Sequence, residues 1–131
     1  MQDDLQRLQG HWRLVRFEEN GVVEPHDTHS APGAILTIDG NHFHVAVPGQ
    51  ASIVEGSFVL GVTLLSPRAI DWTDATGEDA GKTFPAIYTL TQNEFTFLAA
   101  DAGMPRQERF GPEGCSTGQG LTLRRLVRLS P

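Results

Sequence analysis

The chain has 131 residues, of which 39% are hydrophobic and 20% charged, a composition that predicts one globular domain with its own core and excludes a disordered or membrane-spanning chain. Its 16 acidic and 10 basic residues give a net charge of −6, whereas nucleic acids and anionic membranes select basic surfaces. We therefore expect no nucleic-acid partner and no membrane insertion.

A short helix is predicted at the start of the chain. Asp3 and Asp4 precede the amphipathic residues 5–9, acidic side chains suit a helix N-terminus, and Gly10 ends the pattern. Strand-like sequence separated by turn residues follows, and the region 104–110 fits either a further short strand or one arm of a long hairpin. The eight predicted strands cover residues 11–18, 34–39, 41–47, 52–60, 68–73, 83–91, 94–99 and 121–129.

The turns between these runs indicate how the strands are connected. Most of the 14 glycines and 8 prolines fall between the runs, and the sequences 39–41 (Asp-Gly-Asn) and 92–93 (Gln-Asn) are hairpin signals. Eight sequentially paired strands can close on themselves and remove both sheet edges. The sequence therefore predicts a single all-β domain over residues 1–131, an up-and-down antiparallel β-barrel of about eight strands.

Alternation within the runs assigns residues to the two faces of the barrel wall. Phe43, Val45 and Val47 share one face of their run, and His42 and His44 share the other. An eight-stranded barrel is just wide enough to be filled by side chains or to hold one small ligand, and both alternatives remain open. The other residues predicted to point inward are Ala34, Leu36, Ile38, Phe58, Leu60, Ile70, Trp72, Phe84, Ala86, Tyr88, Leu90, Phe95 and Phe97.

The motif Gly10-His11-Trp12, at the start of the first strand, resembles the entry signature of lipocalin and calycin barrels. With the segments 18–21, 67–73, 87–90, 105–110 and 123–125, the chain resembles small bacterial lipocalin-like domains of uncharacterised function. The resemblance implies a barrel whose Trp12 closes one end beneath an arginine of the last strand. Arg125 is the expected partner, with Arg128 as the second choice, because a guanidinium stacks favourably on an indole ring.

Histidines are the candidate metal ligands. His42 and His44 point the same way from one strand, and His26 and His29 lie close together in sequence, so either pair needs a further converging ligand. Because the first pair alternates with an apolar row, we interpret it as the polar outer face of a strand. No histidine follows His44, which argues against haem bound near the C-terminus. We expect no metal and no cofactor.

Catalytic motifs are absent from the sequence, including Gly-x-Ser-x-Gly, a phosphate-binding loop and His-Glu-x-x-His. Asp71 is a candidate base, but we interpret it as an outward residue. Arg16, Arg106 and Arg109 could bind a carboxylate in the lumen, or they are solvated or paired with Glu18, Glu108 or Glu113. The single cysteine, Cys115, forms no intrachain disulfide and is interpreted as incidental. We expect a protein that is not an enzyme.

The connection over residues 19–33 is the candidate lid, because the resemblance places it over the open end of the barrel. Val22 and Val23 would cap an apolar ligand, His26 and His29 would meet its polar group, and the ligand-binding wall would contain Trp72 and Tyr88. The alternative is a mobile loop whose histidines are solvated. The sequence thus predicts non-enzymatic binding of a small apolar or amphipathic molecule. The alternative is a filled barrel that acts as a protein–protein interaction domain.

The N-terminal sequence Met-Gln-Asp-Asp-Leu lacks the apolar stretch of a secretory leader. We therefore expect a cytoplasmic protein, with an exported form whose leader has been removed as the alternative.

Overall fold

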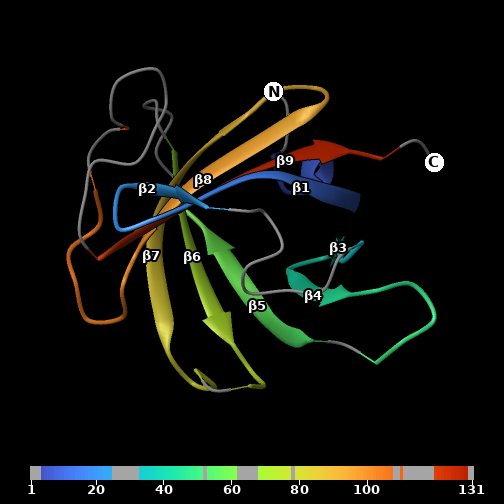
Figure 1. Ribbon diagram of the computed structural model, residues 1–131, viewed down its shortest axis with the longest axis horizontal. Coiled ribbons are helices and arrows are strands. Elements are labelled where there is room, and N and C mark those ends of the chain that lie inside the picture. The colour runs from blue at the N-terminus through green and yellow to red at the C-terminus, as the bar shows by residue number, and fades with distance from the viewer. Residues whose placement is uncertain are drawn as a thin grey trace.

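The computed structural model describes residues 4–24, 33–51, 53–61, 68–77, 79–107, 110 and 120–129. Figure 1 shows the elements of these ranges. None of the helices found there is long and apolar enough to pass through a membrane. The elements are α1 (Asp4–Leu8), β1 (Gly10–Glu19), β2 (Val22–Glu24), β3 (Ile35–Asp39), β4 (His42–Ala46), β5 (Val54–Leu60), β6 (Arg68–Asp74), β7 (Thr83–Leu90), β8 (Glu94–Ala100) and β9 (Leu121–Arg128).

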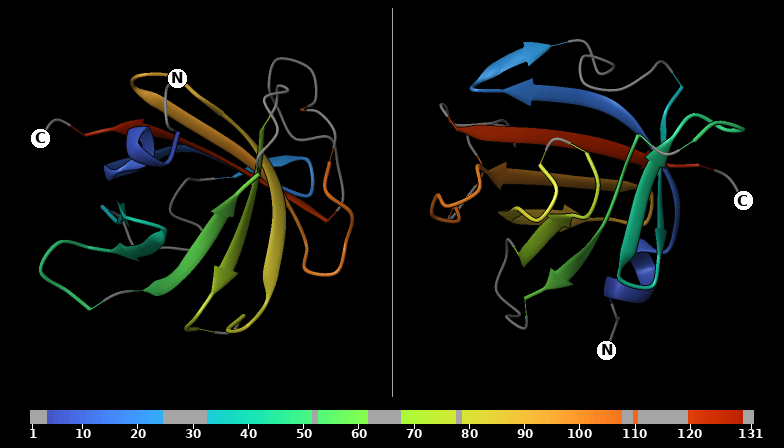
Figure 2. Two further views of the ribbon diagram at one scale, coloured as in Figure 1. Left: turned by 180° about the vertical axis from the view of Figure 1, so that it is seen from behind. Right: turned by 90° about the horizontal axis from the view of Figure 1, so that it is seen from below.

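The strands form one closed antiparallel sheet. From β3 to β9 each strand pairs with the next, and β1 pairs with both β3 and β9, so eight strands close into a barrel (Figures 1 and 2). This confirms the predicted all-β, up-and-down barrel with a short N-terminal helix. The additional strand β2 was not predicted. The turn residues Asn20 and Gly21, with φ of 54° and 83°, fold it back onto the second half of β1.

A β-bulge divides strand β1 into two halves. Its pairing register with β9 shifts between Leu14 and Arg16, so one residue is added on the β1 side. Trp12 and Leu14 point inward before the bulge, and Phe17 points inward after it. The bulge thereby turns Arg16 and its ion-pair partner Glu18 (2.6 Å) away from the lumen.

An aromatic cluster forms the centre of the inner core. The ring centroid of Trp72 lies 4.9 Å from that of Phe97, 5.2 Å from Phe43 and 5.3 Å from Phe58. His42 is exposed on the outer face, as predicted. The predicted inward rows supply most of this core, which contains Leu36, Ile38, Phe43, Phe58, Ile70, Trp72, Ala86, Tyr88, Phe95 and Phe97 with Val45, Leu60, Phe84 and Leu90 packed against it.

A second apolar cluster lies outside the barrel, on the outer face of β7, β8 and β9. Among the described residues between β8 and β9, namely 101–107, 110 and 120, none is in a strand, so the strand considered over 104–110 is not found there. Arg106 instead donates a hydrogen bond to the Ala86 carbonyl (3.0 Å) and contacts the Asp71 carboxylate (2.6 Å), which places Asp71 outside the lumen. The cluster comprises Ile87, Leu98, Ala100, Leu121 and Leu123, with Phe110 packed against it.

One end of the barrel is closed by Trp12 and helix α1. The Trp12 indole N–H donates to the Leu8 carbonyl (2.9 Å), and the Arg128 guanidinium lies 4.2 Å from the Trp12 ring centroid. Arg128 also donates to the carbonyls of Arg7 and Gln9 (3.0 Å for the latter), which lie in and just after α1. A five-residue helix is unstable alone, so these contacts hold it in place.

The predicted pairing of Trp12 with Arg125 is wrong. In the β1–β9 register Trp12 lies opposite Arg128, whereas Arg125 is three residues away and belongs to the outer face of β9. There the Arg125 Nε donates to the Thr96 hydroxyl (3.4 Å). Two arginines of one strand that are three residues apart point to opposite faces, so only Arg128 reaches the indole.

Asp4 connects α1 to the barrel wall through a buried polar network. Its carboxylate is 7% exposed and accepts hydrogen bonds from the Tyr88 hydroxyl (2.7 Å), from Arg68 and from Arg7 (3.3 Å). Burial alone would raise the pKa of the Asp4 carboxyl. The hydrogen bonds from Tyr88 and Arg68 and the two arginine charges outweigh that effect, so the pKa lies below its ordinary value.

The closed end yields a prediction about stability. We expect Trp12→Ala to lower the free energy of unfolding by about 3–5 kcal/mol, because it truncates a fully buried indole. Arg128→Ala should cost about 2 kcal/mol through the lost stacking and carbonyl hydrogen bonds. The matched change Arg125→Ala should cost less than about 1 kcal/mol. Urea unfolding measures all three, and an Arg125 variant as unstable as the Arg128 variant would contradict this assignment.

The Asp4 network yields a prediction about acid sensitivity. Because folding lowers the Asp4 pKa, its ionised form stabilises the native state above the unfolded-state pKa of about 3.9, and this contribution is lost as the pH falls through the folded-state value. Asp4→Asn should therefore cost about 1–3 kcal/mol at pH 7 and progressively less below about pH 4. Urea unfolding across this range checks it, with the exposed Glu55→Gln as control. An equal deficit at every pH would refute the linkage.

Candidate functional site

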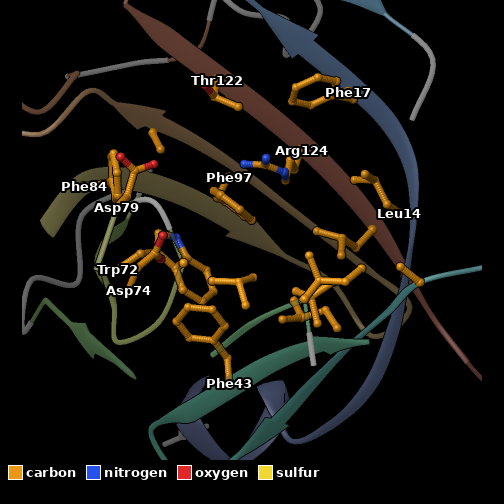
Figure 3. A pocket seen from close by; sticks show the side chains of 18 of the residues that line it. Leu14, Phe17, Phe43, Trp72, Asp74, Asp79, Phe84, Phe97, Thr122 and Arg124 are labelled. Carbon is orange, nitrogen blue, oxygen red and sulfur yellow. The ribbon is translucent and has the colours of Figure 1, made fainter. Parts of the chain in front are cut away.

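The candidate site is a cavity of about 580 Å³ at the end of the barrel opposite α1. Its residues come from the C-terminal ends of β1, β6 and β8 and from the N-terminal ends of β5, β7 and β9, with further residues from neighbouring strands and loops. Figure 3 shows side chains around this space. The volume falls in the range of small-molecule sites, so the lumen is not filled along its whole length.

The wall of the cavity is predominantly apolar. Trp72, Phe43 and Phe97 form part of it with the same rings that build the inner core. Phe58 and Phe95 are at most 1% exposed and do not line the cavity, which leaves only part of the lumen hollow. The remaining apolar lining residues are Leu14, Phe17, Ala34, Leu36, Val45, Ile53, Val54, Phe84, Ala99, Ala100 and Leu126.

Arg124 is the cation of the cavity. It comes from β9, and its guanidinium lies 5.0 Å from the centroid of the Phe17 ring. None of the described residues forms a hydrogen bond or an ion pair with this guanidinium. Burial lowers the pKa of Arg124, and the carboxylates of Glu19 and Asp74 act in the opposite direction. The site thus holds a partly desolvated positive charge that stacks on an aromatic ring.

Asp74 is an anion on the other side of the same cavity. It is the last residue of β6, in phase with the inward residues Ile70 and Trp72. Burial raises the pKa of its carboxyl, the charge of Asp79 raises it further, and Arg124 lowers it. Its carboxylate, like the Arg124 guanidinium, makes no hydrogen bond or ion pair to a described residue. Asp74 and Arg124 therefore interact through their charges without direct contact.

The other polar residues lie towards the mouth. Asp79 lines the cavity and accepts a hydrogen bond from the exposed Lys82 (3.2 Å). Glu19, Asp101 and Thr122 complete the polar lining together with Thr76. In Figure 3, Arg124 projects from β9 over the lumen, and Asp74 and Asp79 lie on the far side of it. The mouth is thus acidic overall around one partly buried cation.

The predicted ligand-binding residues lie in different parts of the barrel. Trp72 lines the cavity, as expected. Tyr88 points inward but does not line it, because its hydroxyl bonds to Asp4 at the closed end. Val22 is 59% exposed on β2 and does not line it either, because the turn after β1 folds Val22 back onto the sheet. The structure thus places neither Tyr88 nor Val22 in the cavity lining, and His26 lies outside the described residues.

The remaining candidates also lie elsewhere. Arg16 and Arg106 form ion pairs outside the lumen, and the segments with His29, Arg109 and Cys115 are outside the described residues. Within the part of the chain that the structure describes, no three His, Cys, Asp or Glu side chains come close enough together to hold a metal ion.

Two residues of the site, Arg124 and Asp74, were not identified from the sequence. Asp74 continues the inward alternation of Ile70 and Trp72, so the periodicity contained its signal. Arg124 lies four residues before Arg128, on the same face of β9. Pairing Arg125 with Trp12 implied that Arg125 points inward and that its neighbour Arg124 points outward, so Arg124 was not considered as a residue of the lumen.

The chain matches no protein-family model, no curated protein and no solved structure.

The raised pKa of Asp74 predicts that this carboxylate destabilises the fold. Since the folded state holds the Asp74 proton more tightly, stability falls as the pH rises from the unfolded-state pKa of about 3.9 through the folded-state value. Asp74→Asn should therefore raise the free energy of unfolding at pH 7 by about 0.5–1 kcal/mol and give no gain below about pH 3.9. Urea unfolding of this variant, with Glu55→Gln as a neutral control, tests it. A loss of stability at pH 7 would contradict the assignment.

Proposed function

We propose that this protein is a non-enzymatic, lipocalin-like binding protein that holds one small amphipathic molecule in the open half of its barrel. The observation that carries this proposal is the cavity of about 580 Å³, with apolar side chains on its wall and charged residues towards its mouth. Pockets that bind small molecules typically combine a mostly apolar lining with a few polar groups that fix orientation.

The hollow half of the barrel favours this function over the alternative of a filled interaction domain. Phe58 and Phe95 fill the lumen near the closed end, but Leu14, Phe97 and Leu126 leave open space beyond it. Apolar surface inside a cavity costs free energy when water covers it, and an apolar ligand would remove that surface from water. A protein partner has no comparable use for an internal cavity.

The lining also supports binding in preference to catalysis. Among the described residues around the cavity there is no Ser, Cys, His, Lys or Tyr side chain, so its carboxylates have none of these nucleophiles beside them to activate. Its two opposite charges, Arg124 and Asp74, are not in contact with each other. Such an arrangement can orient a ligand through electrostatics without activating a nucleophile.

Tryptophan fluorescence tests the proposal, because Trp72 lines the cavity. In a Trp12→Phe background the emission reports Trp72 alone, and titration with small amphiphiles should give a saturable change. Adding Ala99→Leu, which fills part of the cavity, should weaken binding about tenfold or more. The matched change Ala51→Leu at an exposed position should leave binding unaltered. No saturable response to any apolar or amphipathic compound would refute the proposed function.

A further inference from the structure

The cavity contains two charged side chains of opposite sign that lack partners among the described residues. The Arg124 guanidinium and the Asp74 carboxylate both line it, and neither makes a hydrogen bond or an ion pair to a described residue. Both residues are only partly exposed, and a charge that is partly removed from water without a counterion is costly. The pair is therefore better explained as part of a binding site than as a device for stability.

The positions of both residues are fixed by the barrel. The backbone N–H of Asp74 donates to the Lys82 carbonyl (3.2 Å), and its carbonyl accepts from the Gly81 N–H (2.7 Å). Arg124 lies in the middle of β9, which pairs with β1 on one side and β8 on the other, and it stacks on Phe17. The two charges therefore face the cavity from rigid elements on different sides of the lumen, as Figure 3 shows.

A ligand with one charge satisfies only half of this arrangement. A simple carboxylate would pair with Arg124 but would lie in a mouth that already holds the carboxylates of Asp74, Glu19 and Asp79. A simple ammonium would pair with Asp74 but would leave Arg124 desolvated and without an anion. Like charges at close range repel, and a desolvated charge without a counterion is unfavourable.

We propose that the ligand has a zwitterionic head group, in which an anionic group binds Arg124 and a cationic group binds Asp74 while the apolar tail extends towards Trp72. This inference rests on the proposed function and specifies its ligand class. A head group of this kind gives both partly buried charges a partner and adds no net charge to the acidic mouth. Its formation of two charge-assisted hydrogen bonds would also fix the orientation of the tail.

Four compounds with a matched alkyl chain separate the contributions of head and tail. α-Aminodecanoic acid carries both charges, decanoic acid only the carboxylate, decylamine only the ammonium, and decanol neither. At pH 7 and below their aggregation concentrations, the full chain should bind α-aminodecanoic acid at least about tenfold more tightly than each of the other three. Calorimetric titration gives the dissociation constants.

Two substitutions that each remove one charge identify which side chain binds which group of the ligand. Arg124→Gln should weaken binding of α-aminodecanoic acid about tenfold, to the level of decylamine, and Asp74→Asn should weaken it about tenfold, to the level of decanoic acid. Asp74→Asn should at the same time strengthen binding of decanoic acid, because a repelling charge is removed. Decanol should bind the native protein and both variants equally, which shows that the cavity is intact in each of them.

The outcomes separate this inference from the proposed function. Decanoic acid or decylamine binding as tightly as α-aminodecanoic acid would overturn the zwitterionic head group while leaving the binding function in place. An equal loss of affinity for all four compounds in both variants would also overturn the zwitterionic head group. If decanol and the three charged compounds all fail to bind the native protein, the binding function itself is refuted, and the inference falls with it.

Discussion

The stacking of Arg128 on Trp12 is the interaction on which the rest of this barrel depends. It joins the last strand to the first, and through the carbonyls of Arg7 and Gln9 it also secures the five-residue helix α1. The Trp12 indole N–H is satisfied by Leu8 in the same helix. An indole, a guanidinium and a helix end thus form one unit with its polar groups paired, and this unit closes one end of the lumen.

Because one end is closed in this way, the lumen is filled near α1 and hollow towards the other end. Near α1 the lumen is filled by rings such as Phe58 and Phe95, and its buried polar group, Asp4, has several hydrogen-bond donors. Towards the other end the walls remain apolar but separate around a cavity, and the charges of Asp74 and Arg124 are left without partners in the described structure. The network around Asp4 has its polar groups paired, whereas Asp74 and Arg124 are charges with shifted pKa values in a cavity, a combination typical of functional sites.

Periodicity predicted the fold and most of the core because the physical rule is local. In a strand, neighbouring side chains point to opposite faces, so Ile70 and Trp72 were assigned inward and Asp71 outward without knowledge of the partner strands. The same rule does not hold through β1, where the bulge near Val15 shifts the alternation and brings Phe17 to the lumen. It was also ambiguous in β8 and β9, where apolar residues such as Leu98 and Leu123 face the second cluster outside the barrel.

The sequence by itself determined the class of fold, the order of the strands, the hairpin turns and the inward rows, because each of these follows from residues that are close together in the chain. Only the tertiary structure decided that Arg128 and not Arg125 covers Trp12, that Tyr88 binds Asp4 at the closed end, and that Arg124 and Asp74 meet around an open cavity. These features depend on the register between the first and last strands and on the depth of each residue in the barrel. Both quantities are set by the closure of the sheet, which brings together residues more than one hundred positions apart and leaves no trace in local periodicity.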